Sequence, residues 1–520
     1  MSRFIVKTVD IVFYILIGII LAASMSSLCG LVSDGLLGYV LFIALLLFVF
    51  AVWYFGSDVL NFAHKKIYMP ISKVSLFKMV FCIFLVSLVT KVFFVFLFDN
   101  DAANTIDMSL YASFAQQLSD SGEITENLVP AWNYQYQVIY GLFLSPIVSV
   151  FGKDTKALTV FLSLLLSIAS VFLFDIIRKY VGSTIAFIGI LLYNLLPVGL
   201  FQSQLLIHET PLLFFHIISL WLFLKYYDKK YNLALRILCL FLSALIISFA
   251  NKINQGGTIV IISFCIFCIA KTFIDKITIK KIISVLFQIL CFGLCFVVMS
   301  NACSAFVKNV VSESSKATKK IEYRLPMGWA VYLGFNYEKS GHWNESDSNT
   351  YEMYSEFDNK DDAIEYQKGL IEERLQKYID EPGIIPLHIF NKFKGLWGIP
   401  FLPFAYDDGN EINKFVLEGA GGIIYKCLLL ISSLSFIIVC SMILFSHRRL
   451  KNINLKEKCT PEMHFKMVII GLTLALILFE VMPKYVSHLQ IIVFAVWMFG
   501  LRSFYKNSKA IKLKIGRKKI

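Results

Sequence analysis

Long runs of apolar residues, separated by short polar segments, recur along most of the chain. A membrane-spanning helix needs about 20 predominantly apolar residues. Twelve stretches meet this requirement: 11–32, 36–56, 76–98, 157–177, 184–204, 211–227, 233–250, 256–273, 282–305, 421–445, 467–482 and 485–501. A further apolar stretch, 137–152, is shorter and contains Pro146. The pattern predicts an all-α polytopic membrane protein with about twelve transmembrane helices.

The composition supports the same fold class. Of the 520 residues, 57% are hydrophobic and only 16% are charged, whereas a soluble domain carries about 25% charged residues. This excludes a soluble globular enzyme. Most of the eleven cysteines lie in apolar runs. We therefore expect them to be core residues that form neither a disulfide framework nor a cysteine metal centre.

The distribution of charge predicts the orientation in the membrane. If 137–152 does not span, the segments on one side hold 28 Lys and Arg against 6 Asp and Glu. The opposite segment 99–156 holds two lysines against seven acids. Because cytoplasmic loops are rich in Lys and Arg, both termini are predicted in the cytoplasm of a plasma-membrane protein. The net charge of +13 is then an orientation signal, and no nucleic-acid partner is expected.

Five regions follow from this topology. Residues 1–75 form two spans and a cytoplasmic loop, and 76–305 form a transmembrane core. Within the core, 99–156 is predicted as two surface helices joined through Ser121, Gly122 and Pro130. Residues 306–420 are predicted as a small mixed extracytoplasmic subdomain, 421–505 as the C-terminal spans, and 506–520 as a basic cytoplasmic tail.

Two acids are the main candidates for chemistry. Asp107 and Tyr111 lie one turn apart on a predicted helix next to the membrane, where a carboxylate is well placed to act on a lipid-borne substrate. The alternative is capping, with Asn104 as N-cap and Asp107 in the first turn. Glu209 and Pro211 follow the fifth span on the same predicted face. They also have the alternative of starting the next helix.

Other polar residues lie at the outer edge of the predicted spans. Tyr134, Tyr136 and Gln137 open the second surface helix, where an interfacial aromatic belt is the alternative. Lys91, Lys252 and Lys484 are candidates for binding a lipid phosphate, because ionisable groups inside a membrane are costly. Their alternative is snorkelling to lipid headgroups, which we favour for Lys91.

The order of these features resembles the GT-C superfamily of membrane glycosyltransferases over about residues 76–505. The similarity is greatest to the branch with protein O-mannosyltransferases and bacterial aminoarabinose transferases. The matching segments are Asp107-Met108-Ser109-Leu110-Tyr111-Ala112, Tyr134 to Tyr136 with Phe151-Gly152, Glu209-Thr210-Pro211, Gly334-Phe335-Asn336, Gly341-His342-Trp343-Asn344, and Glu480 with Lys484-Tyr485.

The resemblance implies that a sugar is moved from a polyprenyl-phosphate donor to an extracytoplasmic glycan, lipid or protein, with inversion. It implies Asp107 as general base. It implies Glu209 as the second catalytic residue, either orienting the acceptor or, with Asp107, binding a divalent cation such as Mg or Mn. The donor phosphate would be bound by Lys252, Lys484 and Tyr485. The implied substrate-binding residues are Tyr111, Tyr134, Tyr136, Gln137, His208, Trp343, Asn344 and Glu480.

Some residues depart from the family pattern. Met108 stands where some relatives have a second acid, so a metal is open, and Lys484 replaces an Arg and lacks its bidentate fork. Two other classes stay as alternatives. A glycan or lipid transporter would show matching halves, which this chain lacks. A polysaccharide polymerase would be expected to carry more arginines than Arg324 and Arg374 in its large outer loop.

Overall fold

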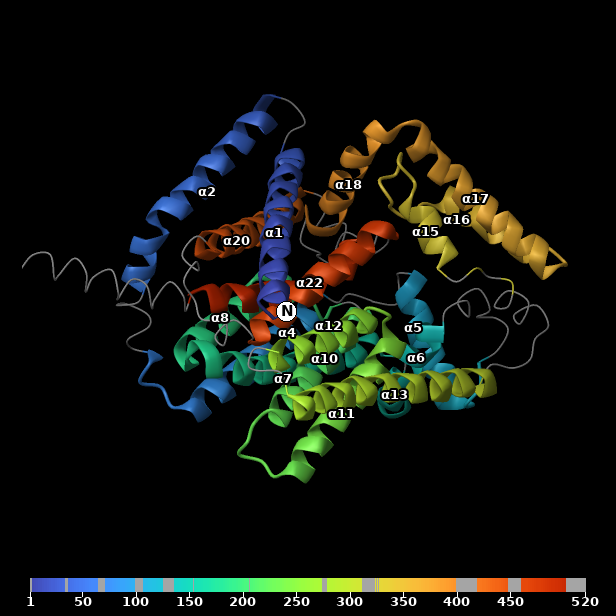
Figure 1. Ribbon diagram of the computed structural model, residues 1–520. Helices are drawn as coiled ribbons and strands as arrows, with labels where there is room; N and C mark the ends of the chain where they lie inside the picture. The colour runs from blue at the N-terminus through green and yellow to red at the C-terminus, as the bar shows by residue number, and fades with distance from the viewer. Residues whose placement is uncertain are drawn as a thin grey trace, which may run out of the picture.

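The fold is described from a computed structural model. The described residues are 2–32, 36–63, 71–98, 106–124, 135–152, 154–204, 206–273, 278–310, 323, 325, 327–398, 419–447 and 460–501. Their regular structure is helical and contains no strands, which confirms the predicted all-α class (Figure 1).

Among the described residues, eight helices are long and apolar enough to cross a membrane. Seven of them are α1 (Ser2–Val32), α4 (Leu76–Phe98), α7 (Thr155–Val181), α11 (Leu233–Ile253), α13 (Ile279–Val310), α20 (Gly419–His447) and α22 (Pro461–Leu478). The eighth, Lys484–Leu501, begins with α23 (Lys484–Ser487) and is interrupted by a turn at His488. These helices confirm a polytopic membrane protein.

The predicted count of twelve spans is not reached by this criterion. Helices α2 (Leu36–Ala63) and α10 (Glu209–Tyr226) occupy two further predicted spans, but α8 (Ser183–Leu195) and α12 (Gly257–Thr272) have only 13 and 16 residues. The predicted span 184–204 ends early at Leu196, which is extended with ψ 148°. Proline disfavours helical backbone at the preceding residue, so Pro197 starts the separate short helix α9 (Pro197–Leu200).

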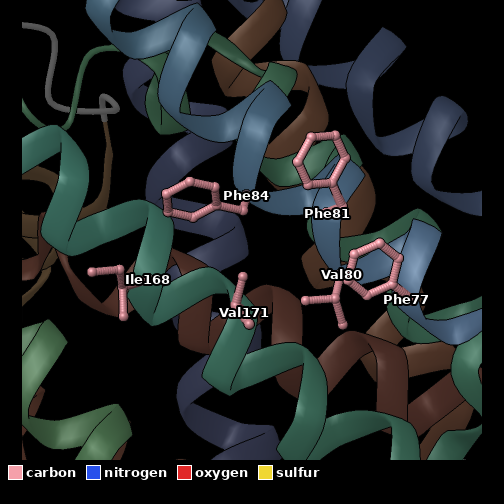
Figure 2. A pocket seen from close by; sticks show the side chains of 6 residues that line it. All are labelled: Phe77, Val80, Phe81, Phe84, Ile168 and Val171. Atoms are coloured by element: carbon pink, nitrogen blue, oxygen red, sulfur yellow. The ribbon is translucent and has the colours of Figure 1, made fainter.

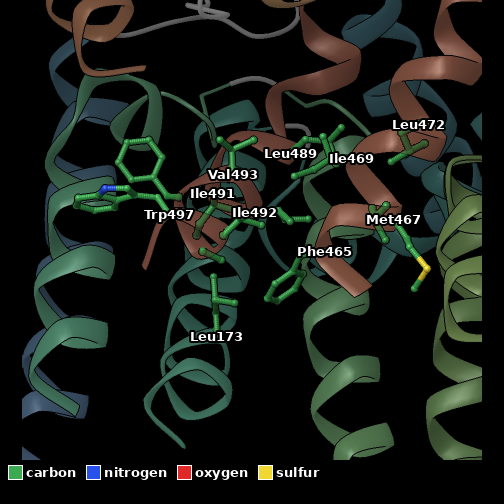
Figure 3. Packing of buried hydrophobic residues seen from close by; sticks show 14 of the residues in the cluster. Leu173, Phe465, Met467, Ile469, Leu472, Leu489, Ile491, Ile492, Val493 and Trp497 are labelled. Atoms are coloured by element: carbon green, nitrogen blue, oxygen red, sulfur yellow. The ribbon is translucent and has the colours of Figure 1, made fainter. Parts of the chain in front are cut away.

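Close packing of the bundle depends on small residues and hydroxyl groups. Helices α10 and α11 lie side by side, and the hydroxyls of Ser219 and Ser243 are 2.9 Å apart between them. Such hydrogen bonds and small side chains hold helices together where lipid removes the hydrophobic drive between them. Figure 3 shows the apolar part of this core, where Phe465 and Leu489 lie in one buried cluster with Leu173 of α7.

The two predicted surface helices are present as α5 (Ile106–Asp120) and α6 (Gln135–Phe151). They pack closely because Gly141 of α6 faces α5, and a Cβ at this position would be only 2.6 Å from the Cβ of Phe114. Their shared core includes Tyr111, Tyr140 and Leu144. The pair therefore forms a firm platform for the side chains at its edge.

The large subdomain after α13 is helical in its described part, and the strands of the predicted mixed subdomain are not found there. Its elements are α15 (Gly328–Gly334), α16 (Glu345–Glu352), η4 (Met353–Glu356), α17 (Lys360–Asp380), η5 (Pro382–Ile384), α18 (Ile385–Phe393) and η6 (Lys394–Gly398). Asp347 holds the subdomain together: one carboxylate oxygen accepts from Arg374 at 2.6 Å and the other from Asn336 and Asn344. Burial alone would raise the pKa of Asp347, but the hydrogen bonds from these donors outweigh it and lower the pKa below its ordinary value.

An ion cluster joins the first helix to α22. Lys466 of α22 lies 2.8 Å from Asp10 of α1 and 2.7 Å from Glu462 one turn earlier in α22. The side chain of Lys466 is almost fully buried, so both acids are needed to compensate its charge. The cluster places residues near 10 and 462 at the same end of the bundle, as the predicted topology requires.

An apolar depression of about 250 Å³ lies between α4 and α7. Figure 2 shows that its wall consists of Phe77, Val80, Phe81, Phe84, Ile168 and Val171. None of these side chains has an acid, a base or a hydrogen-bond donor, so this depression offers no chemistry.

Candidate active site

Glu209 is a buried carboxylate at the first turn of α10. Its exposed fraction is 1%, and its Oε2 lies 2.8 Å from Nδ1 of the neighbouring His208. The free N–H groups and the dipole at a helix N-terminus stabilise a negative charge. Glu209 does start the helix, as its alternative role required, but burial and the His208 contact give it a specific environment as well.

Tyrosine rings surround His208. The imidazole stacks on Tyr136 with ring centroids 5.1 Å apart, and its centroid lies 6.1 Å from that of Tyr111 and 6.5 Å from that of Tyr140. Tyr140 also donates a hydrogen bond to the carbonyl of Ile207 at 3.4 Å. Helices α5 and α6 therefore form an aromatic wall beside the Glu209–His208 pair. Tyr140 was not among the predicted site residues, although it follows Tyr136 by one turn.

Asp107 lies in the first turn of α5, one turn before Tyr111. Residues spaced by four share one face of a helix, so the backbone brings Asp107 to the edge of the helix that contacts His208 through Tyr111. The side chain of Asp107 lies outside the described residues, as does the whole of Tyr134.

Two side chains near the start of α23 lie within electrostatic range of Glu209, and one of them, Lys484, carries a positive charge. Glu209 interacts electrostatically with Lys484 at the start of α23 and with His488 at the turn that follows. His488 is 3% exposed, and neither ring nitrogen has a hydrogen-bond partner in the described part of the chain. Lys484 was predicted, but His488 was not. Its spacing of four residues from Lys484 was the available signal.

A buried amide beside the aromatic wall also lacks a partner. Gln137 is 5% exposed and follows Tyr136 in α6, and its Oε1 accepts no hydrogen bond from the described residues. Burying an amide oxygen without a donor is costly. The predicted residue Gln137 therefore presents an acceptor suited to a hydroxyl group.

Glu480 lies just before α23 and contacts Tyr485. The phenol of Tyr485 donates to Glu480 Oε2 at 3.1 Å, and Lys484 Nζ lies 5.7 Å from the centre of the Tyr485 ring. The structure therefore brings together Glu480, Lys484 and Tyr485 as one unit, and Lys484 connects this unit to Glu209.

The helical subdomain is hydrogen-bonded to the segment that carries Glu480. Lys392 of α18 is 1% exposed and donates to the carbonyls of Gly334 and Phe479 at 2.8 and 2.7 Å. The backbone N–H of Val481 donates to Gly341 at 2.9 Å. Burial lowers the pKa of Lys392 to about 7. The glycine-rich stretch of the sequence thus serves as a contact surface for residues 479–481.

His388 binds the same carbonyl. Its Nε2 lies 3.1 Å from the oxygen of Gly334, and because a carbonyl only accepts, Nε2 carries the proton. Burial, together with the charge of Lys392, lowers the pKa of His388 to about 4. The imidazole is therefore neutral at physiological pH.

Three predicted residues have other contacts in the structure. Lys252 lies against α13, with Nζ 5.0 Å from the ring of Phe296. Trp343 is 46% exposed on the helical subdomain. Asn344 caps α16: its Oδ1 accepts from the backbone N–H of Asp347, and its amide nitrogen donates to the Asp347 carboxylate. Asn344 therefore has a structural role in this subdomain.

Lys91 contradicts the snorkelling interpretation. Its side chain is 1% exposed, and Nζ donates to Ser87 at 2.9 Å and to the amide oxygen of Asn194 on α8. Ser167 and Ser170 of α7 extend this buried polar network. Lys91 therefore points into the bundle and ties α4, α7 and α8 together.

The described residues do not form a metal centre. They contain no group of three His, Cys, Asp or Glu side chains that could hold a metal ion. Glu209 is paired with His208, and the side chain of Asp107, the other predicted ligand, lies outside the described residues. A divalent cation held by these two acids therefore stays a prediction.

Residues 138–300 match the protein family described as dolichyl-phosphate-mannose-protein mannosyltransferase. The match covers just under a third of the chain and includes His208 and Glu209, but neither Asp107 nor Lys484. It supports the resemblance to the GT-C superfamily and a membrane glycosyltransferase of that type. No curated protein and no solved structure matches the chain.

Proposed function

We propose that the chain, a multi-pass membrane glycosyltransferase of the GT-C type, moves a sugar from a polyprenyl-phosphate donor to an extracytoplasmic glycan, lipid or protein. The observation that carries the proposal is the buried Glu209–His208 pair. Tyrosine rings surround His208. Lys484 and His488 both lie within electrostatic range of Glu209. The Glu209–His208 pair also falls in the segment that matches the family. A sugar phosphate needs these two chemistries side by side: rings and polar groups for the sugar, and positive charge for the phosphate.

The proposed reaction is a direct displacement at the anomeric carbon. The acceptor hydroxyl oxygen forms a new bond to this carbon while the bond from the carbon to the phosphate oxygen breaks. The hydroxyl proton passes to the carboxylate of Asp107, a general-base contribution of about 10²–10⁴-fold. The lipid phosphate leaves with the bonding electron pair, and the Lys484 ammonium stabilises the charge that develops on it.

The remaining residues would position the substrates. The Glu209 carboxylate accepts a hydrogen bond from Nδ1 of His208, which keeps the proton on Nδ1. The other ring nitrogen, Nε2, can then accept a hydrogen bond from a sugar hydroxyl. Tyr136 and Tyr111 would line the sugar, and the unpartnered Oε1 of Gln137 would accept from a second hydroxyl. In this arrangement Glu209 orients the acceptor through His208.

The test compares cell-envelope glycans by mass spectrometry in a wild-type strain, a deletion strain and the deletion strain carrying variants at matched protein amounts. We expect Asp107→Asn and Glu209→Gln to insert normally and to lose one sugar, while the lipid-linked donor accumulates. Lys368→Met is the matched control, because Lys368 is exposed on α17. Glycans restored by Asp107→Asn would refute the general base. Glycans restored by both acid variants would favour the transporter alternative.

A further inference from the structure

Helix α18 has its polar side chains on the inside. His388 and Lys392, one turn apart, are 4% and 1% exposed and bind backbone carbonyls. By contrast, Ile385, Leu387 and Ile389 are 37%, 52% and 37% exposed. Residues 385–391 carry no acidic or Lys/Arg side chain. This arrangement is the reverse of that of a helix on a water-exposed surface.

The chain after α18 reaches the depth of the membrane. Ser24 of α1 donates to the carbonyl of Trp397 at 2.9 Å. The apolar span of α1 covers Phe4–Gly30, so Ser24 lies about 9 Å from its end at 1.5 Å per residue. The span is about 40 Å long, some 10 Å more than the hydrocarbon thickness of about 30 Å. Trp397 therefore lies close to the hydrocarbon boundary.

The C-terminal end of α18 is continuous with the membrane core. Phe393, Leu396 and Trp397 belong to the same buried cluster as the spanning helices. Helix α18 contacts α1 and lies beside it in Figure 1. The first two turns of α18 lead directly to this contact, so their apolar side chains lie near the end of α1 that carries Ser24.

We propose that α18 is an interfacial helix, and that Ile385, Leu387 and Ile389 insert among the acyl chains of the leaflet in which α1 ends. An apolar helix face without charge is stable at this depth, because lipid replaces the protein contacts that it lacks. The inference goes beyond sugar transfer and does not depend on it. Lys392 of the same helix holds Phe479 next to Glu480, so one helix links the lipid surface to the last outer turn.

The test places a fluorescent amino acid at position 387 by codon suppression, and at position 389 in a second protein. The full chain is reconstituted in phosphatidylcholine vesicles and exposed either to a lipid with a nitroxide on its acyl chain or to aqueous iodide. Position 368 on α17 is the matched control. We expect the lipid nitroxide to quench positions 387 and 389 several-fold more than position 368, and iodide to show the opposite order.

Three results would overturn the proposal. Iodide quenching at positions 387 and 389 equal to that at 368 would place the helix face in water. Protection from both quenchers would show that a protein surface, such as a second copy of the chain, covers it. Equal lipid quenching at all three positions would place the whole subdomain on the bilayer and remove the assignment to the α18 face.

Discussion

The contact between the helical subdomain and residues 479–481 makes a sharp prediction at Gly334. A Cβ at this position would lie 2.6 Å from the carbonyl carbon of Phe479 and 2.8 Å from the oxygen of Leu478, whereas ordinary contacts begin at 3.4 Å. In Gly334→Ala the two backbones must therefore separate by about 0.8 Å. Overpacking of this kind costs about 1–3 kcal/mol. A misplacement near 1 Å lowers the rate by about 10²-fold, and Glu480, a predicted substrate-binding residue, follows Phe479 directly.

The assay measures restored glycan per amount of folded membrane protein, together with the apparent unfolding temperature. We expect Gly334→Ala to lose most of the glycan signal and to unfold at a lower temperature. The matched control is Gly369→Ala in α17, where a Cβ meets nothing within 4 Å and where alanine stabilises a helix by about 0.5–1 kcal/mol. Wild-type values for Gly334→Ala would refute the reasoning, since they would mean that the backbone contact does not position the turn.

Two buried lysines give further predictions for the apparent unfolding temperature. Lys392 has a folded pKa of about 7 and an ordinary value of 10.5. Between these values the unfolded chain binds more protons, so stability rises with pH. Lys392→Met should flatten this rise and Lys368→Met should not; an unchanged slope in Lys392→Met would contradict the assignment. Lys466→Met removes the buried cation that pairs with Asp10 and Glu462 and should cost about 3–5 kcal/mol, partly recovered by adding Asp10→Asn. An unaltered unfolding temperature would contradict a buried ion cluster.

The apolar runs predict the helices well, because lipid requires each span to satisfy its own backbone. The predicted span 76–98 coincides with α4. The span 184–204 was predicted too long because hydrophobicity alone does not show that Pro197 ends the helix by making Leu196 extended. The helical subdomain was predicted as mixed, although Asn344 and Asn359 in that polar stretch are the N-caps of α16 and α17.

The site is predicted only in part, because local sequence patterns do not show which residues distant in the chain lie close together in the fold. Glu209, His208 and Tyr136 were predicted, and the structure brings them together. His488 lies in an apolar run, where its spacing of four residues from Lys484 is only a weak signal, and its interaction with Glu209 identifies it as part of the site. The burial of Lys91 depends on Asn194, which lies 103 residues further along the chain. The position of Lys91 near the end of its span therefore led to the wrong prediction that its side chain points toward the lipid headgroups.

The ion cluster at Lys466 has a consequence for how the protein is made. Asp10 precedes Lys466 by 456 residues, which ribosomes add in roughly 20–90 s at about 5–20 residues per second. During this time α1 has neither Lys466 nor its other contacts with α22. Helix α1 is therefore synthesised long before the contact that ties it to α22 can form. A chain released before α22 is synthesised lacks this contact between α1 and α22, although α1 can still pack against α2 and α20.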